Sequence, residues 1–385
     1  MKIEPTTNSP IPKQPIPKRT IQHAQVENRS QGREFPQEKG IEPELGYYDP
    51  IVYVVTEREN GWTLKTLLHN RLGVSRKLTS RLKMTERGIT LNGERVYISV
   101  YVRAGDLVEL RMEREISDDI LPEEMPLDIL YEDRDLLIVN KAAGVIVHPT
   151  QGHYTGTLAN GVVRHWRDRG EQVRFRPVHR LDRETSGVLA IAKNPYVHQH
   201  ISEQMIAGTV DKTYRAIVHG CPQPESGRIE GPIDRDPENP HVRIVTPGGY
   251  AAATRYRTLE RYDAQRASLV ELELESGRTH QIRVHMTHAG CPLIGDTMYK
   301  YTSADPLNEP QLLQARLLDT WIDRQALHAF RLSFVHPGTR ERMTFEAPFP
   351  PDLEELERRL NSGQSAQADR PVTQERDVNR TDDFA

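Results

Sequence analysis

The sequence predicts an α+β protein with a mixed, largely antiparallel sheet, preceded by a small α+β module. Alternating, strand-like segments recur in runs between residues 127 and 350, with only a few helical patterns among them. Two helical stripes and several short strands form a separate group at 50–114. Neither G-x-G-x-x-G nor G-x-x-x-x-G-K-[ST] occurs, so the sequence does not support a dinucleotide or phosphate-loop nucleotide site.

Length and composition limit the possible organisation of the chain. The chain has 385 residues, enough for one large domain or two unequal ones with tails. Proline-rich residues 1–49 and charged residues 351–385 are expected to be mostly disordered, and 115–126 to form an acidic linker. Prolines replace the apolar region of a signal peptide, and no stretch approaches about 18 apolar residues. We therefore expect a cytoplasmic protein without a membrane partner, and reduced, buried thiols at Cys221 and Cys291.

Charge is distributed unevenly along the chain. Residues 60–114 hold eleven Lys or Arg against five acidic residues, whereas 115–138 hold nine acidic residues against Arg134 alone. A basic unit followed by an acidic joint favours contact with a polyanion. A solvated charged surface without a partner is the alternative interpretation.

The small module is predicted as two helices followed by short strands. One helical face is formed by Trp62, Leu64, Leu67, Leu68 and Leu72. Leu78 and Leu82 indicate a second helix, and its basic edge consists of Arg76, Lys77, Arg81 and Lys83. Turns at 92–93 and 104–106 divide the following alternating segment into strands.

The larger part is predicted from buried and alternating runs. Strands are expected at 136–139, 188–192, 213–220 and 268–276. Asn194 and Pro195 begin a helix with an apolar stripe, and Gly208 ends it. A further helix is expected from Thr279, its cap, to Ala289, with Gly290 stopping it.

The segment 177–194 is a polar loop placed directly before an apolar strand, a favoured position for chemical groups. Asp182 stands between Arg180 and Arg183, cations that should keep it ionised as a nucleophile or base. The alternative is a purely structural turn, stabilised by local ion pairs and by side chain to backbone hydrogen bonds from Thr185 and Ser186.

Four ordered segments carry a family resemblance. HRLDRETSGVLAIAK resembles the HRLD-x-x-TSG motif of RluA-type RNA pseudouridine synthases, which isomerise uridine in ribosomal or transfer RNA. DKTYRAIVHG (211–220), ESGRTHQIRVHMTHAGCPLIGD (275–296) and ALHAFRLSFVHPGT (326–339) resemble the tyrosine-bearing, arginine-bearing and closing-strand motifs. The resemblance covers about 127–350, and the module at 60–114 resembles an S-four-like RNA-binding module. One departure is Lys141-Ala142-Ala143-Gly144, where the family usually has Lys-Pro-Ala-Gly.

The resemblance implies a cofactor-independent isomerase acting on single-stranded or flipped-out uridine. It assigns the catalytic roles to Asp182, Tyr214 and Arg283, and substrate contacts to Arg180, His179 and Thr185. The basic residues Arg76, Lys77, Arg81 and Lys83 would bind RNA. Ribosomal RNA is the expected partner, with transfer RNA as the second candidate, and we expect a monomer. We expect no metal, because His280, His285 and His288 lack a carboxylate or cysteine at ligand spacing.

Two other classes of function compete with this interpretation. An RNA-binding ribosome-assembly factor with dispensable catalysis would not need Asp182, Tyr214 and Arg283 together. A hydrolase that uses Asp182 on a glycosidic bond lacks the second carboxylate that such enzymes normally supply.

Overall fold

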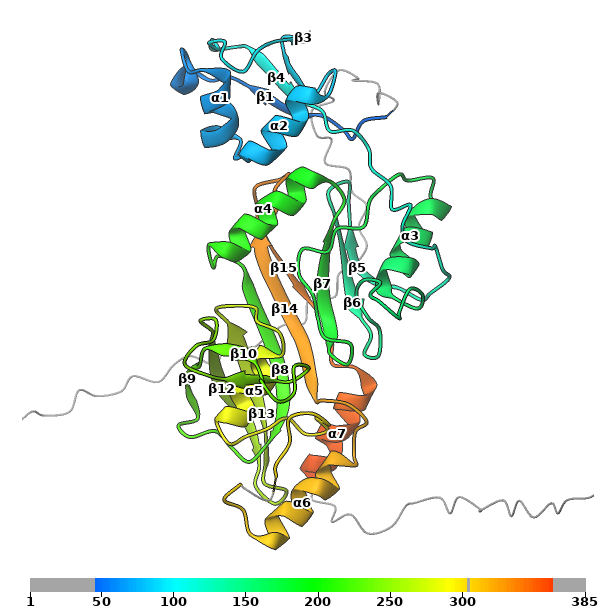
Figure 1. The fold of residues 1–385 in the computed structure, drawn as a ribbon, viewed down its shortest axis with the longest axis vertical. Helices are drawn as coiled ribbons and strands as arrows, with labels where there is room; N and C mark the ends of the chain where they lie inside the picture. The colour runs from blue at the N-terminus through cyan, green and yellow to red at the C-terminus, as the bar shows by residue number, and fades with distance from the viewer. Residues whose placement is uncertain (1–45, 303–304, 363–385) are drawn as a thin grey trace, which may run out of the picture. The chain divides into compact units, whose positions relative to one another are not determined.

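A nine-stranded sheet forms the centre of the larger part of the molecule (Figure 1). The computed structural model describes residues 46–302 and 305–362, all within one unit that begins at Pro43. The strands follow the order β5-β6-β7-β14-β8-β13-β12-β9, and β15 pairs with β14. Their bounds are β5 Asp128–Glu132, β6 Leu136–Lys141, β7 Ser186–Ala192, β8 Asp211–His219, β9 Ser226–Glu230, β12 Ala253–Tyr262, β13 Ala267–Leu274, β14 Leu327–Val335 and β15 Arg342–Glu346.

The predicted fold class is confirmed by the pairing in this sheet. Within the described residues, β14 pairs in parallel with β7, and the other neighbouring strands of the sheet pair antiparallel. All seven residues of β7 are buried, as its continuous apolar run predicts. In β13, Val270 and Leu272 are buried while Glu273 is exposed, which matches the predicted alternation.

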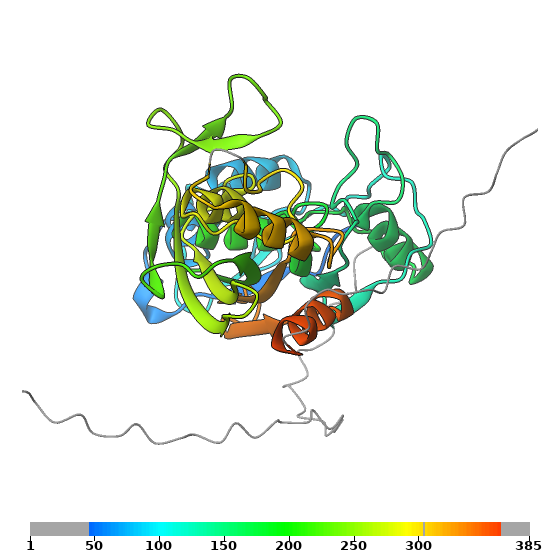
Figure 2. The same ribbon diagram turned by 90° about the horizontal axis from the view of Figure 1, so that it is seen from below.

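Two apolar clusters lie on opposite faces of the central strands. In β8, Ala216 and Val218 belong to the main core, whereas Ile217 belongs to a second cluster with residues of α6 and α7. Helices α3 and α4 contribute Trp166 and Ile201 to the main core. The helices are α3 Leu158–Asp168, α4 Pro195–Ile206, α5 Gln281–His288, α6 Glu309–Asp319 and α7 Pro351–Ser362. Figure 2 shows α7, in orange-red, against the orange end of the sheet.

Helix α4 begins and ends where the sequence predicts. The Asn194 side chain accepts a hydrogen bond from the Val197 N–H, Pro195 occupies the first turn, and Gly208 follows in a left-handed conformation. The prediction for α5 needs a correction at its start. His280, with φ of 57°, occupies the capping position without a side-chain cap, so Thr279 does not cap the helix.

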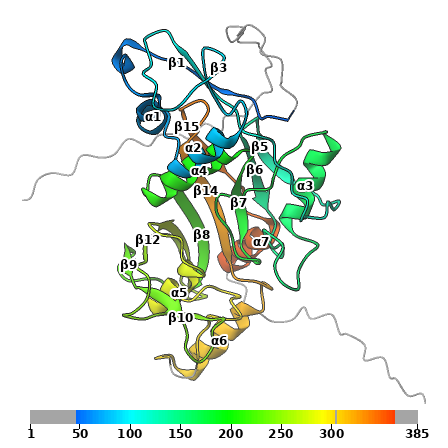
Figure 3. The ribbon, with the colours of Figure 1, turned by 45° about the horizontal axis from the view of Figure 1, so that its top comes forward.

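A short hairpin lies beside α5 (Figure 3). Its strands are β10 Ile233–Arg235 and β11 Arg243–Val245, which pair antiparallel. Ile233 of β10, Val284 of α5 and Tyr299 form a small buried cluster with Ala252. The hairpin therefore helps to fix the start of α5 against the loop that follows it.

The small module is a four-stranded sheet of order β1-β4-β2-β3 with short helical segments. Its elements are β1 Ile51–Val54, a 3-10 turn Glu57–Glu59, α1 Leu64–Thr66, a π-helical stretch Leu67–Arg71, α2 Arg76–Met84, β2 Ile89–Leu91, β3 Glu94–Arg95 and β4 Leu107–Leu110. The predicted helical stripe and the turn at Asn92-Gly93 are present. The expected strand between 96 and 103 is not, and irregular backbone occupies that segment.

The structure differs from expectation at several places near the segment ends. Residues 46–49 already belong to the module, since the Tyr48 N–H donates to the Met112 carbonyl. Residues 351–362, expected to be largely disordered, form α7, which buries Leu353, Leu356 and Leu360. Cys221 is half-buried, although Cys291 is buried as expected. The remaining tail residues, 1–45 and 363–385, lie outside the described residues. None of the described helices has the length and apolar character needed to cross a membrane.

Candidate active site

One cavity gathers residues from the polar loop, β8, the end of β13 and α5. Its volume is about 550 Å³. All six residues predicted for catalysis or substrate contact line it, namely His179, Arg180, Asp182, Thr185, Tyr214 and Arg283. They come from segments up to a hundred residues apart in the chain, and the order of strands in the sheet brings them together.

The loop that carries Asp182 is tightened just before β7 begins. The Thr185 N–H donates to the Asp182 carbonyl at 3.1 Å, which closes a turn. Gly187 then takes a φ of 117°, and a Cβ there would lie 2.2 Å from the carbonyl oxygen of Ala329 in β14. Glycine is therefore required where β7 meets its parallel neighbour, and this close approach fixes the loop against the sheet.

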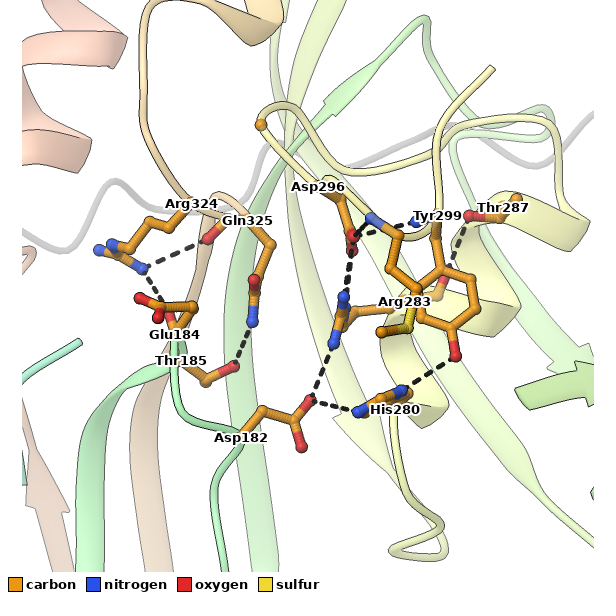
Figure 4. Close-up of polar contacts among 12 residues, drawn as sticks. Asp182, Glu184, Thr185, His280, Arg283, Thr287, Asp296, Tyr299, Arg324 and Gln325 are labelled. Carbon is orange, nitrogen blue, oxygen red and sulfur yellow. Dashed lines mark hydrogen bonds and ion pairs between the residues drawn. The ribbon is translucent and has the colours of Figure 1, made fainter. Parts of the chain in front are cut away.

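The Asp182 carboxylate is one-fifth exposed and faces two donors from α5 and its start (Figure 4). Arg283 Nη1 lies 3.5 Å from Oδ2, and His280 Nε2 lies 3.9 Å from the same oxygen. The sequence neighbours expected to neutralise Asp182 do not do so. Arg183 pairs with Glu184 and donates to the Gly144 carbonyl, and Arg180 is exposed.

Arg283 is buried and oriented by a second carboxylate. Its Nε and Nη2 donate to Asp296 Oδ2 and Oδ1 at 2.6 and 2.8 Å, a bidentate pair. Burial lowers the pKa of Arg283, but the Asp296 hydrogen bonds and the charges of both carboxylates outweigh it, so the pKa is raised overall. The guanidinium also lies 4.8 Å from the ring centre of Tyr299. Arg283 is thus a fixed cation that reaches Asp182 with its remaining nitrogen.

Tyr214 and His179 form apolar and neutral walls of the cavity. Tyr214 is 8% exposed, and burial together with the Asp182 charge raises its pKa above the usual value, so the phenol stays neutral. His179 accepts the Ala190 N–H through Nε2 at 3.3 Å. Burial and Lys212 lower the pKa of His179 to about 4, so the ring is also neutral. The hydrogen bond gives His179 a structural role in addition to its place at the cavity.

Comparison with known proteins places this geometry in a family. The model described as RNA pseudouridylate synthase matches residues 135–288, and that of the RluD ribosomal pseudouridine synthase N-terminal domain matches 52–108. An uncharacterized RNA pseudouridine synthase of Bacillus subtilis (strain 168), YhcT, is 39% identical over 303 residues, covering 79% of this chain and 95% of the relative. The chain belongs to the RNA pseudouridine synthase family.

A further relative agrees with this assignment. Ribosomal large subunit pseudouridine synthase D of Neisseria meningitidis (serogroup A, strain Z2491) is 44% identical over 240 residues, covering 61% of this chain and 62% of that protein. The solved structure of human RNA pseudouridylate synthase domain containing 4 is 26% identical with a TM-score of 0.48, covering 61% and 93% of the two chains. The predicted recognition, enzyme class and RNA substrate are confirmed.

In this pseudouridine synthase, Lys141 connects a turn to the Asp182 loop. The buried ammonium donates to the carbonyls of Ala142 and Val145 at 2.8 Å and of Arg183 at 3.0 Å. The Gly144 N–H also donates to the Arg183 carbonyl. Burial lowers the pKa of Lys141 to about 7, although three carbonyl acceptors favour its charged form. Sequence reasoning treated this turn as a minor departure and missed the contact.

A second missed group holds the other side of the loop. Buried Arg324 donates to the Glu184 carbonyl at 3.0 Å and pairs bidentately with Asp352 at the start of α7. Gln325 donates to the Thr185 hydroxyl at 3.3 Å (Figure 4). Arg324 and Gln325 lie just before the closing-strand motif and belong to none of the quoted motifs. Apart from that position, the sequence gives no indication of their role. They explain why α7 is an ordered part of this enzyme.

The basic residues of the module lie together on α2. They are distant in sequence from the cavity residues, and none of them lines the cavity. All four side chains are exposed. Arg81 differs from the others because Glu115 binds its guanidinium in a close ion pair. The first turn of α2 therefore offers Arg76 and Lys77 to solvent, with Lys83 in its last turn.

Two groups of residues contain histidines that could be considered as metal ligands. His285 contacts the Thr254 hydroxyl through Nδ1 and the Gly231 carbonyl through Nε2, so both ring nitrogens are used. A group not foreseen from the sequence, Asp133, Asp135 and His336, has ligand atoms within 4.8 Å of one another. The His336 Nδ1 accepts two backbone N–H groups, which leaves the proton on Nε2, 3.1 Å from Asp133. The 3.1 Å contact lacks hydrogen-bond geometry, so Nε2 is a buried nitrogen without a hydrogen bond among the described residues.

Proposed function

We propose that this pseudouridine synthase converts specific uridines of large-subunit ribosomal RNA into pseudouridine. Its RluD-type N-terminal domain match and a relative named for the ribosomal large subunit support this substrate. Transfer RNA is the second candidate. We expect the enzyme to act as a cytoplasmic monomer.

The observation that carries the proposal is the Asp182 carboxylate in the cavity, which faces the fixed cation Arg283. The other acidic residue of the lining, Glu275, pairs with Arg228 and Arg255 instead. The isomerisation breaks the bond from ribose C1′ to uracil N1, turns the base and joins C1′ to C5. It needs a carboxylate that attacks C1′ or removes a sugar proton, and Asp182 is proposed for that step. Because the reaction has no net redox change, it requires no cofactor.

The cavity walls suit the freed base. We propose that the neutral ring of Tyr214 holds the uracil while it turns, and that Arg283 keeps Asp182 anionic. The exposed Arg180 would enter the space that the flipped nucleotide leaves, which offsets part of the few kcal/mol that flipping costs. His179 and Thr185 would complete the nucleotide contacts from the same loop.

The module supplies affinity rather than chemistry in this proposal. Arg76, Lys77 and Lys83 would neutralise RNA phosphates, and Arg81 would do so only by leaving Glu115. Phosphate contacts of this kind position the RNA without reading its bases.

Pseudouridine mapping in total RNA tests the proposal. RNA is compared from cells that have the protein, lack it, or carry only Asp182→Asn. The proposal predicts that one or more ribosomal positions lose pseudouridine in the last two strains. Loss of a transfer RNA site instead would correct the substrate. Unchanged ribosomal and transfer RNA together with defective ribosome assembly would favour the assembly-factor alternative.

A further inference from the structure

His280 lies at the cavity in a strained backbone conformation. Its φ of 57° and ψ of 20° lie in the left-handed region, immediately before α5. Non-glycine residues held there cost on the order of 1–3 kcal/mol, and such strain gathers at functional sites. The conformation brings His280 Nε2 to 3.9 Å from Asp182 Oδ2.

The hydrogen bonds of Tyr299 decide which nitrogen of His280 carries the proton. The buried Tyr299 hydroxyl accepts the Arg243 N–H at 2.8 Å and contacts His280 Nδ1 at 2.9 Å. Among the described residues, His280 Nδ1 is the acceptor within reach of the Tyr299 proton. Because a buried hydroxyl proton needs an acceptor, Tyr299 donates to Nδ1, and the ring proton is on Nε2. Burial raises the pKa of Tyr299, which keeps this proton in place.

We propose that His280 is a positioning residue whose neutral Nε2–H, aimed by Tyr299 at the Asp182 carboxylate, closes its 3.9 Å separation to a hydrogen bond when the nucleotide binds. This proposal rests on the proposed role of Asp182. His280 and Arg283 both approach Oδ2, from two positions one helical turn apart (Figure 4). Held through Oδ2, the carboxylate presents Oδ1 to the sugar of the flipped nucleotide.

The charges around His280 are consistent with a neutral ring. Burial lowers the pKa of His280, and Arg283 and Arg243 lower it further, while Asp182 and Asp296 raise it. Asp182 in turn faces charged or titratable groups from several elements, and these are His280, Arg283, Lys141 and Tyr214. The net direction for His280 is downward, so it stays a donor with a single proton at neutral pH.

The test compares His280→Phe, which keeps the ring but removes the N–H, with His280→Gln, which keeps an amide N–H. His288→Phe is the matched control, since His288 is exposed at the far end of α5. Release of tritium from large-subunit ribosomal RNA transcripts labelled at uridine C5 gives kcat and KM across pH. RNA affinity and thermal unfolding are measured for each variant.

We expect His280→Phe to lower kcat about 10- to 100-fold, the loss of one hydrogen bond to a charged group, with KM changed less than twofold. Its acid limb should move to higher pH, because the site loses a hydrogen-bond donor that favours its charged form. His280→Gln should recover part of kcat, and His288→Phe should match the wild type. Wild-type kcat and acid limb in His280→Phe, or a loss in KM alone, would overturn the proposal.

Tyr299→Phe provides a second variant that leaves His280 and its backbone unchanged. Because His280 is then free to move its proton to Nδ1, kcat should fall by less than in His280→Phe, and adding Tyr299→Phe to His280→Phe should cost nothing more. Additive losses would refute the coupling. Asp182→Asn is assayed beside these variants. If it is inactive while His280→Phe is normal, only this inference fails, whereas an active Asp182→Asn removes the proposed function as well.

Discussion

Replacing Arg283 with Met removes the cation that faces Asp182. At the observed 3.5 Å and an effective dielectric constant of about 20, the attraction between the two charges is about 5 kcal/mol before desolvation is subtracted. We expect about 3–4 kcal/mol of this to be lost from the transition state, a fall in kcat of about 100- to 1,000-fold. The acid limb of the pH–rate profile should move to higher pH, because the buried cation that opposes proton uptake at the site is gone.

The same substitution leaves Asp296 buried without its partner, which costs about 3–5 kcal/mol of stability. The double variant Arg283→Met, Asp296→Asn separates the two effects, since it removes the orphaned charge and should recover stability without recovering activity. Arg283→Lys should be partly active. Arg261→Met is the matched control, because Arg261 pairs with Glu225 at the surface. A pH–rate profile unchanged by Arg283→Met in a folded protein would refute the reasoning and make Arg283 a structural ion pair.

Two other predictions follow from the loop contacts and the module. Lys141→Met should lower the free energy of unfolding by about 3 kcal/mol, since it leaves the carbonyls of Ala142 and Val145 without a donor. It should also reduce kcat more than KM; thermal unfolding and tritium release check both, and unchanged values would mean that the turn is held without Lys141. Replacing Arg76, Lys77 and Lys83 with Ala should raise KM and leave the single-turnover rate unchanged. The slope of log affinity against log salt concentration should fall by at most about 2.1. An unchanged slope would mean that the module is a structural unit.

The elements predicted correctly are those whose local pattern agrees with their burial. The apolar run 188–192 of β7 and the Asn194-Pro195 start of α4 are decided by side chains within a few positions of one another. The start of α5 was predicted wrongly because Thr279 is a good capping residue in isolation. The side chain of His280 instead reaches Tyr299, and a local preference cannot anticipate that tertiary contact.

The candidate site likewise combines features that local sequence predicts with features that depend on tertiary contacts. The motifs predicted which residues line the cavity, but sequence adjacency suggested the wrong cations for Asp182. Arg183 pairs with Glu184 and Arg180 is exposed, whereas Arg283, from a helix, faces the carboxylate. Helix α7 was missed because its charged residues are typical of a tail. Its buried leucines and the ion pair of Asp352 with Arg324 become evident only in three dimensions.

Turnover by Asp182→Asn tests the central claim most directly. The substitution keeps the size of the side chain and removes its charge, so the fold and RNA affinity should be retained. With large-subunit ribosomal RNA transcripts labelled with tritium at uridine C5, the account predicts tritium release by the wild type and none by Asp182→Asn at equal RNA occupancy. Substantial release by Asp182→Asn would contradict it and show that another group starts the reaction.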